Sequence, residues 1–146
     1  MSDETKDCIF CKIIRGEIPS AKVYEDDDVF AFLDLSQVTK GHTLIIPKKH
    51  EKDLFHLDPN VAATLFRRVP VIARAIKEAF HPVGMNLLNN NSSLAGQSVF
   101  HYHIHLIPRY DENDTFSFQF QPHVDDYSNE QRADIAAAIA EHIKSI

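Results

Sequence analysis

The sequence contains no long hydrophobic run and no excess of positive charge. None of its apolar stretches approaches the ~18 residues that a membrane-spanning helix needs. Its 15 Lys and Arg residues are outnumbered by 21 Asp and Glu, and the formal net charge of −6 disfavours general nucleic-acid binding. The amino terminus, MSDETKDCIF, is polar and acidic, unlike a secretory signal. We therefore expect a cytoplasmic protein whose partners are neither membranes nor nucleic acids.

Cysteine is also scarce, since the chain has only Cys8 and Cys11. Thiols stay reduced inside cells, so we expect a metal pair or a redox pair rather than a structural disulfide. The Cys-x-x-Cys spacing alone leaves zinc binding and redox chemistry open. A thioredoxin-like pair follows a strand and opens a helix, whereas no strand is predicted before Cys8.

The chain lacks internal repeats, low-complexity tracts and long linkers. Its 146 residues are too few for two comfortable domains. They suffice for one hydrophobic core, because a chain of this size buries about 68–70% of its unfolded surface. We expect a single domain over residues 1–146.

The hydrophobic pattern predicts strands and helices that are interspersed along the chain. The longer helix covers 57–80, with Asp58 as N-cap, Pro59 at its first position and Pro70 at a kink or bend. A C-terminal helix covers 128–143, with Ser128 as its cap. Short segments rich in β-branched and aromatic residues predict five strands, at 23–25, 29–33, 42–47, 84–89 and 99–108. This order favours an α+β fold with a mainly antiparallel sheet.

Three histidines alternate with other residues in the segment HYHIHLI. Side chains of a strand alternate between faces, so His101, His103 and His105 share one face. Tyr102 and Ile104 then point into the core. The outer two histidines begin about 13 Å apart, too far for one ion to collect all three. Two of them can share an ion, but we expect three different roles.

The segment AGQS before this strand by itself indicates a plain loop, but its place next to the histidines favours an anion-binding loop. Gly96 lets the backbone approach a ligand closely, and nearby N–H groups and the Ser98 hydroxyl can hold a phosphate. Neutral imidazole is a competent nucleophile at neutral pH because its ordinary pKa is about 6.5. Phosphate donors beside histidines therefore indicate phosphoryl or nucleotidyl transfer onto histidine.

The segment HYHIHLI resembles the His-φ-His-φ-His-φ-φ pattern of the histidine triad (HIT) family of nucleotide hydrolases and transferases. The similarity extends over residues 8–109, including CIFCKIIRGEIPSAKVYEDDDVFAFLDLSQVTKGHTLIIPKKH and AGQSVFHYHIHLIPR. It is greatest to the small branch that contains purine nucleoside phosphoramidate hydrolases and bacterial HIT proteins. The resemblance implies a HIT-like core over 8–109 and an extension over 110–146.

The resemblance also implies roles for individual residues. His103 resembles the nucleophile that becomes nucleotidylated, and His105 and His42 resemble phosphate-side residues, His105 also assisting the leaving group. Asp34 resembles the carboxylate that accepts from the ribose hydroxyls. The loop residues that resemble the phosphate site or the lining of the nucleotide site are Asn90, Gly96, Gln97 and Ser98. The residues that resemble the apolar slot for the purine are Ile9, Phe10, Ile13, Phe32 and Leu35.

Zinc-bearing members of the family imply a structural Zn²⁺ site in this chain. Its ligands would be Cys8, Cys11, His50 and His101, with no open position. A free thiol pair is the alternative. The resemblance further implies a homodimer, and no organic cofactor.

The activity implied by the resemblance is hydrolysis of purine nucleoside phosphoramidates, such as adenosine 5′-monophosphoramidate. His103 would attack the α-phosphorus, the amine would leave, and water would release AMP. Three alternatives stay open: a dinucleoside polyphosphate hydrolase of the Ap3A or Ap4A type, which would use the same triad, a non-catalytic AMP-binding sensor or adaptor, and a redox protein using Cys8 and Cys11. The sequence does not distinguish an adenine substrate from a guanine substrate.

Overall fold

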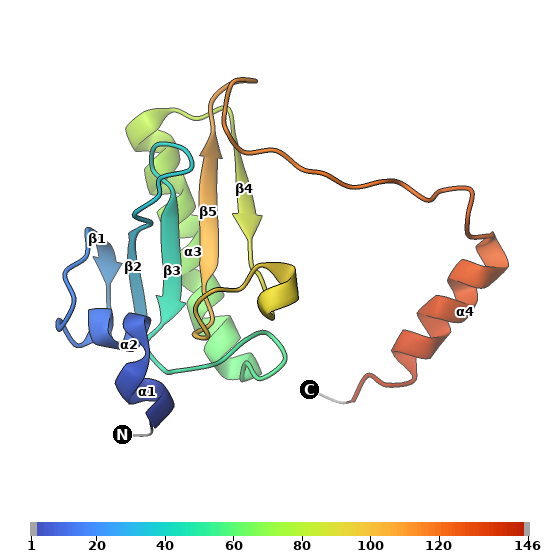
Figure 1. Cartoon of the computed structure of the whole chain (residues 1–146), viewed down its shortest axis with the longest axis horizontal. Coiled ribbons are helices and arrows are strands. Elements are labelled where there is room, and N and C mark those ends of the chain that lie inside the picture. The colour runs from blue at the N-terminus through green and yellow to red at the C-terminus, as the bar shows by residue number, and fades with distance from the viewer. Residues whose placement is uncertain (1–2, 145–146) are drawn as a thin grey trace. The chain divides into compact units, whose positions relative to one another are not determined.

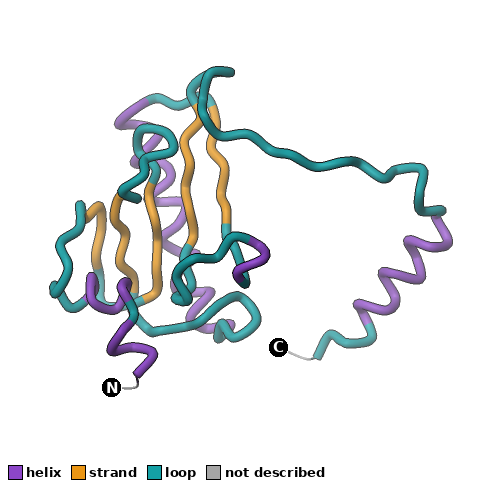
Figure 2. Tube along the Cα trace, in the orientation of Figure 1, coloured by secondary structure: helices purple, strands orange, loops and turns teal. Residues whose placement is uncertain are grey.

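A computed structural model describes residues 3–144 and divides the chain into two compact units, one ending at Phe116 and one beginning at Ser117. The first unit contains a sheet with one long helix against it (Figures 1 and 2). Among the described residues, no helix is both long and apolar enough to span a membrane.

The sheet has five strands in the order β1-β2-β3-β5-β4, and every neighbouring pair is antiparallel. The strands β2 and β3 are almost entirely buried, which fits their apolar, β-branched and aromatic sequences and their central position. This confirms the predicted fold class and antiparallel sheet. The strand bounds are β1 Lys22–Glu25, β2 Val29–Leu33, β3 Thr43–Pro47, β4 Gly84–Leu88 and β5 Ile104–Arg109.

The long helix α3, Pro59–Phe80, connects β3 to β4 and covers one face of the sheet (Figure 1). The Asp58 side chain accepts from the Asn60 N–H, and Pro59 occupies the first turn, as predicted. Pro70 lies within the helix. The core on this face consists of Val29, Ala31, Ile45, Leu65, Val69, Ile72, Ile76, Tyr102, Ile104 and Leu106.

Two short helices that the sequence pattern does not predict precede the sheet, α1 at Asp3–Asp7 and α2 at Ile9–Ile14. Cys8 is the N-cap of α2, and its sulfur accepts from the Cys11 N–H. The helix α2 packs against the sheet through a second apolar cluster, made of Phe10, Ile13, Phe30, Phe32, Leu44 and Ile46. Because Cys8 caps α2 and Cys11 lies within it, this packing places both cysteines beside the sheet.

The fifth strand is shorter than predicted, because it begins at Ile104 instead of residue 99. The residues before Ile104 form hydrogen bonds outside the sheet. The Tyr102 N–H donates to the Glu51 carbonyl at 2.6 Å. The His103 carbonyl accepts from the Asn89 side chain at 2.9 Å. Nevertheless Tyr102 and Ile104 lie in the core beside α3, as the alternation predicts.

The second unit, described by itself, contains helix α4 at Asn129–Ala140. Ser128 caps it in a reciprocal capping box with Gln131, as its sequence suggests. The helix ends three residues before the predicted boundary at 143, and none of its residues is buried. Residues 117–127 contain no helix or strand.

Candidate functional site

His103 is held just before β5 in a single orientation. Its Nδ1 lies 2.8 Å from the carbonyl oxygen of His101. A carbonyl only accepts, so Nδ1 carries the proton and Nε2 keeps its lone pair. The ring is only 5% exposed, and its burial lowers its pKa below the ordinary value. His103 is therefore a neutral imidazole whose Nε2 has no hydrogen-bond partner among residues 3–144, as nucleophilic attack requires.

Two further imidazoles, those of His42 and His105, form a hydrogen-bond chain in which each proton can be assigned to one ring nitrogen. The Val38 N–H donates to Nδ1 of His42 at 3.3 Å, so the proton of His42 lies on Nε2. That Nε2 lies 2.9 Å from Nδ1 of His105 and donates to it. His105 must then carry its own proton on Nε2. Burial, followed by the neighbouring His103 and His42, lowers the pKa of His105 to about 4, which keeps it neutral.

Asp34 lies next to these imidazoles at the end of β2. Its Oδ1 accepts from the Ser36 N–H at 2.7 Å and from the Ser36 hydroxyl at 2.6 Å. Burial raises the pKa of Asp34, but these bonds and the nearby histidines outweigh it and the pKa is lowered overall. Its Oδ2 lies 3.8 Å from Nε2 of His42 and is not hydrogen-bonded within the described part of the chain. One carboxylate oxygen thus stays available to a ligand.

The loop predicted to bind phosphate is built around Gln97. This side chain is only 4% exposed; its Oε1 accepts from the Ser92 N–H, and its Nε2 donates to the carbonyls of Lys52 and Val99. Both polar atoms of the side chain are used within the protein, so the Gln97 amide shapes the loop. The exposed Ser98 hydroxyl follows it.

Gly96 has a φ of 94°, which favours glycine, and packs beside Asn90. A Cβ added at Gly96 would lie 3.4 Å from the Asn90 amide nitrogen. The structure therefore brings Asn90 next to the predicted phosphate loop. The neighbouring Asn89 instead donates to the His103 carbonyl.

The five residues of the predicted purine slot differ in their exposure. Phe10, Ile13 and Phe32 are buried and belong to the cluster between α2 and the sheet. Ile9 is 51% exposed and Leu35 is fully exposed. Of the five, only Ile9 and Leu35 present substantial free apolar surface. The Phe10 ring also packs edge-on against His103, with ring centroids 5.1 Å apart.

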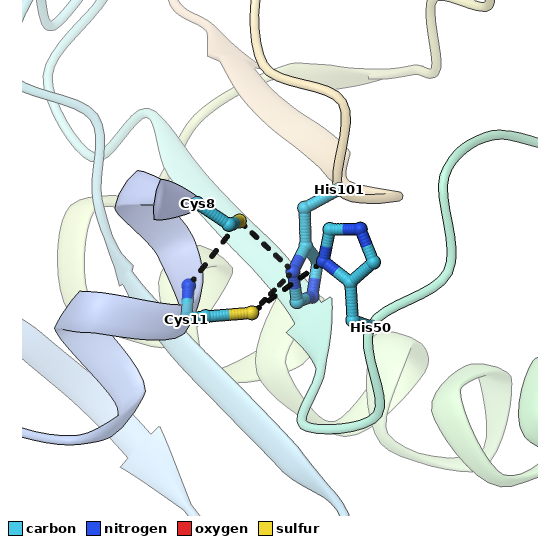
Figure 3. Close-up of side chains that lie close together, drawn as sticks. All are labelled: Cys8, Cys11, His50 and His101. Atoms are coloured by element: carbon cyan, nitrogen blue, oxygen red, sulfur yellow. Dashed lines mark hydrogen bonds between the residues drawn. The ribbon is translucent and has the colours of Figure 1, made fainter. Parts of the chain in front are cut away.

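The four predicted zinc ligands converge from distant parts of the chain (Figure 3). Nδ1 of His101 lies 3.5 Å from the sulfur of Cys8 and 3.5 Å from that of Cys11. Nδ1 of His50 lies 3.4 Å from the Cys11 sulfur. A tetrahedral ion with Zn–S bonds of about 2.3 Å and Zn–N bonds of about 2.0–2.1 Å gives S···N separations of about 3.5–3.6 Å. The spacing of these donors therefore fits zinc.

The protonation of the cluster also fits a metal ion. Nε2 of His101 donates to the Pro47 carbonyl at 2.8 Å, which leaves Nδ1 facing the two sulfurs. Burial, together with Cys8, raises the pKa of the Cys11 thiol to about 12. A thiolate at Cys11 would therefore need a cation beside it. Protein side chains would fill all four coordination positions of a tetrahedral ion, so these four ligands suit a structural ion.

The HIT domain family model matches residues 15–112 of this sequence. The chain belongs to the HIT family. A crystal structure of a HIT family member from Bacillus subtilis is 55% identical to it, with a TM-score of 0.93, covering 96% of this chain and 99% of that one. A zinc-bound histidine triad family protein from Mycobacterium smegmatis is 35% identical, with a TM-score of 0.71, covering 94% and 99%.

Relatives of this HIT chain include proteins with enzyme names. Protein hit of Bacillus subtilis is 55% identical over 140 residues, 96% of this chain and 97% of that protein. Adenylylsulfatase HINT3 of Arabidopsis thaliana is 50% identical over 103 residues, 70% of this chain and 52% of that protein. Adenosine 5′-monophosphoramidase hnt1 of Schizosaccharomyces pombe is 40% identical over 105 residues, 72% and 76%.

Several residues that support the HIT site were not predicted. Val38 acts through its backbone N–H, Pro47 through its carbonyl, and Ser36 through both of its donors to Asp34. No side-chain type marks a backbone donor or acceptor in a sequence. Ser36 had a readable signal, because Asp-x-Ser is typical of turns in which the carboxylate accepts from residue i+2.

Proposed function

We propose that this HIT family nucleotide hydrolase cleaves AMP-linked phosphoramidates through a nucleotidyl intermediate on His103. The observation that carries the proposal is the orientation of His103. Its Nδ1–H is held by the His101 carbonyl, and burial keeps the ring neutral. A histidine in this state can form a bond to phosphorus only through Nε2.

In the first step, Nε2 of His103 attacks the α-phosphorus, the bond from phosphorus to the leaving nitrogen breaks, and that nitrogen takes up a proton from solvent and departs as the neutral amine. His105 lies alongside, with its ring centroid 5.1 Å from that of His103. Its Nε2–H can donate to a phosphate oxygen or to the leaving nitrogen as negative charge accumulates there. The charge that develops on the phosphorylated His103 ring is stabilised by the His101 carbonyl at Nδ1.

In the second step, water attacks the nucleotidyl phosphorus and the bond from phosphorus to Nε2 breaks. AMP is released, the water gives up one proton to solvent, and the neutral His103 is restored. Asp34 would meanwhile hold the ribose through Oδ2, the oxygen that Ser36 does not occupy. Forming a covalent intermediate divides one difficult displacement into two easier ones.

The leaving group is tested by comparing substrates at equal concentration. We expect AMP release to be fastest from adenosine 5′-monophosphoramidate, slower from adenylyl sulfate and a diadenosine polyphosphate, and abolished in His103→Ala. The matched control is His142→Ala, which changes an exposed histidine of the second unit and should retain full activity. Binding of AMP without release from any of these compounds would favour a nucleotide sensor instead.

We also propose that Cys8, Cys11, His50 and His101 hold a zinc ion. The S···N separations of 3.4–3.5 Å and the zinc-bound relative support this proposal. When bound, the ion would cross-link α2 to the segments that carry the two histidines. Elemental analysis of protein purified without chelators should find about one zinc per chain, and much less in Cys11→Ser. A chain without zinc whose thiols titrate freely would contradict it.

The homodimer inferred from the HIT resemblance also stays a proposal. Its support is the position of β4 at one end of the strand order, where it pairs only with β5 in the described chain. An edge strand can pair with a second copy. Light scattering of the full chain should give twice the chain mass of 16.6 kDa, whereas a monomer mass would contradict the proposal.

A further inference from the structure

We propose that the Cys8, Cys11, His50 and His101 cluster positions the nucleophile, so that metal occupancy of the cluster sets the rate of nucleotidyl transfer. This inference rests on the proposed role of His103. It differs from a purely structural role because it assigns the cluster an effect on kcat in protein that stays folded.

The first connection runs through His101. Its Nδ1 lies in the cluster, and its own backbone carbonyl accepts the Nδ1–H of His103 at 2.8 Å. The residue is completely buried, and Nε2 is bound to the Pro47 carbonyl. A change in the position of the His101 ring is therefore passed to the carbonyl that orients the nucleophile.

The second connection runs through α2. This helix carries both cysteines, and Phe10 lies between them in the sequence. The Phe10 ring packs edge-on against both His101 and His103, with centroid separations of 5.9 Å and 5.1 Å. Holding the two sulfurs to His50 and His101 thus also holds Phe10 against the nucleophile.

The cluster without a cation offers weak restraint. Its four residues are then linked by S···N contacts of 3.4–3.5 Å, by the Cys11 N–H to the Cys8 sulfur, and by edge-on packing of the His50 and His101 rings. Such contacts involve a weak donor or a weak acceptor. Four metal–ligand bonds fix the same atoms much more tightly. The position of His103 should therefore respond to metal occupancy.

One side of the cluster faces a solvent-filled cleft. A cleft of about 300 Å³ beside it is lined by Cys8 and His50 and reaches Ser98 of the predicted phosphate loop. The exposed Lys52 also lines this cleft but supplies no cluster atom. A chelator or a second metal ion can therefore approach the cluster from the side of Cys8 and His50, while Cys11 and His101 are buried behind them.

The test compares the full chain loaded with zinc, depleted with a chelator, and reloaded with Zn²⁺ or with the larger Cd²⁺. The measurements are kcat with adenosine 5′-monophosphoramidate, the Kd for AMP, and the ¹⁵N and ¹H resonances of the His103 ring. Circular dichroism checks that each form is folded. Depletion should lower kcat by about 10- to 100-fold while Kd changes by less than about threefold, and zinc should restore it.

Two further comparisons distinguish an effect on the position of His103 from an effect on the stability of the fold. The Cd²⁺ form keeps the fold but lengthens the bonds to His101, so its kcat should fall and the His103 resonances should shift. Among variants, His50→Gln should lose the zinc response, whereas the control Lys52→Ala, on the same cleft, should retain it. If depleted protein unfolds, the Cd²⁺ form decides the question.

Equal kcat and unchanged His103 resonances in folded depleted protein, or in the Cd²⁺ form, would overturn the inference. Failure of the zinc-loaded wild type to form any nucleotidyl adduct would instead refute the proposed function. The two failures are therefore distinguishable. A loss of AMP binding in parallel with kcat would indicate a general loosening of the site and would also contradict specific positioning.

Discussion

The substitution Asp34→Asn tests how the site holds the ribose. Asn keeps the shape of the side chain and an oxygen that can accept from Ser36, but it removes the negative charge. Only Oδ2 of Asp34 is available to a ligand, because Oδ1 already accepts from the Ser36 N–H and hydroxyl. A hydrogen bond to a charged group contributes about 1.5–3 kcal/mol. We therefore expect the Kd for AMP to rise by about 10- to 150-fold.

Isothermal titration calorimetry with two nucleotides isolates this contact. AMP should lose affinity as stated, whereas 2′,3′-dideoxyadenosine monophosphate, which lacks both hydroxyls, should lose less than about threefold. The control Ser36→Ala removes one donor to Asp34 but keeps the carboxylate, so AMP binding should stay within about threefold of wild type. Equal losses for both nucleotides in Asp34→Asn, or no loss for AMP, would refute the ribose contact.

Three other predictions follow from burial. Burial lowers the pKa of His103, so the ring is neutral at any pH above this lowered pKa. We therefore expect kcat/KM to fall only when the pH drops below the ordinary histidine pKa of about 6.5. A midpoint of the pH profile at or above 6.5 would contradict this expectation. Ile45→Ala, at a fully buried site, should lower the free energy of unfolding by about 2–5 kcal/mol in urea titrations, against under about 0.5 kcal/mol for the exposed Val71→Ala. Gln97→Leu should lower the free energy of unfolding by about 1–3 kcal/mol in the same titration, since it removes three hydrogen bonds, with the Ser92 N–H and with the Lys52 and Val99 carbonyls; an unchanged midpoint would refute its role in the loop.

The elements with a clear hydrophobic period could be predicted from the sequence. The bounds of β2 match the prediction, and those of β1, β3 and β4 differ by one residue at one end. Asp58 and Pro59 mark the start of α3 because capping is a local property. By contrast, α1 and α2 have only five and six residues, too few to show a helical period. The start of β5 was wrong because the partners of Tyr102 and His103 lie far away in the sequence.

The site shows the same division between local and distant information. The alternation of His101, His103 and His105 is visible in the sequence, as is the placement of Tyr102 on the opposite, core side. The convergence of His50 with the two cysteines could be inferred only from the family resemblance, because 39 residues separate it from Cys11. The tautomers of His42 and His105 depend on one backbone N–H of Val38, which no residue type reveals.

The most direct test of the nucleotidyl-histidine intermediate is to locate the bond between phosphorus and nitrogen. Protein labelled with ¹⁵N in its histidines is mixed with adenosine 5′-monophosphoramidate, quenched in alkaline denaturant, and analysed by mass spectrometry and ³¹P–¹⁵N NMR. Because Nδ1–H of His103 is held by the His101 carbonyl, we predict a single nucleotidyl adduct, on Nε2 of His103. An adduct on Nδ1, on His101 or on His105, or AMP release with no adduct at all, would contradict the account.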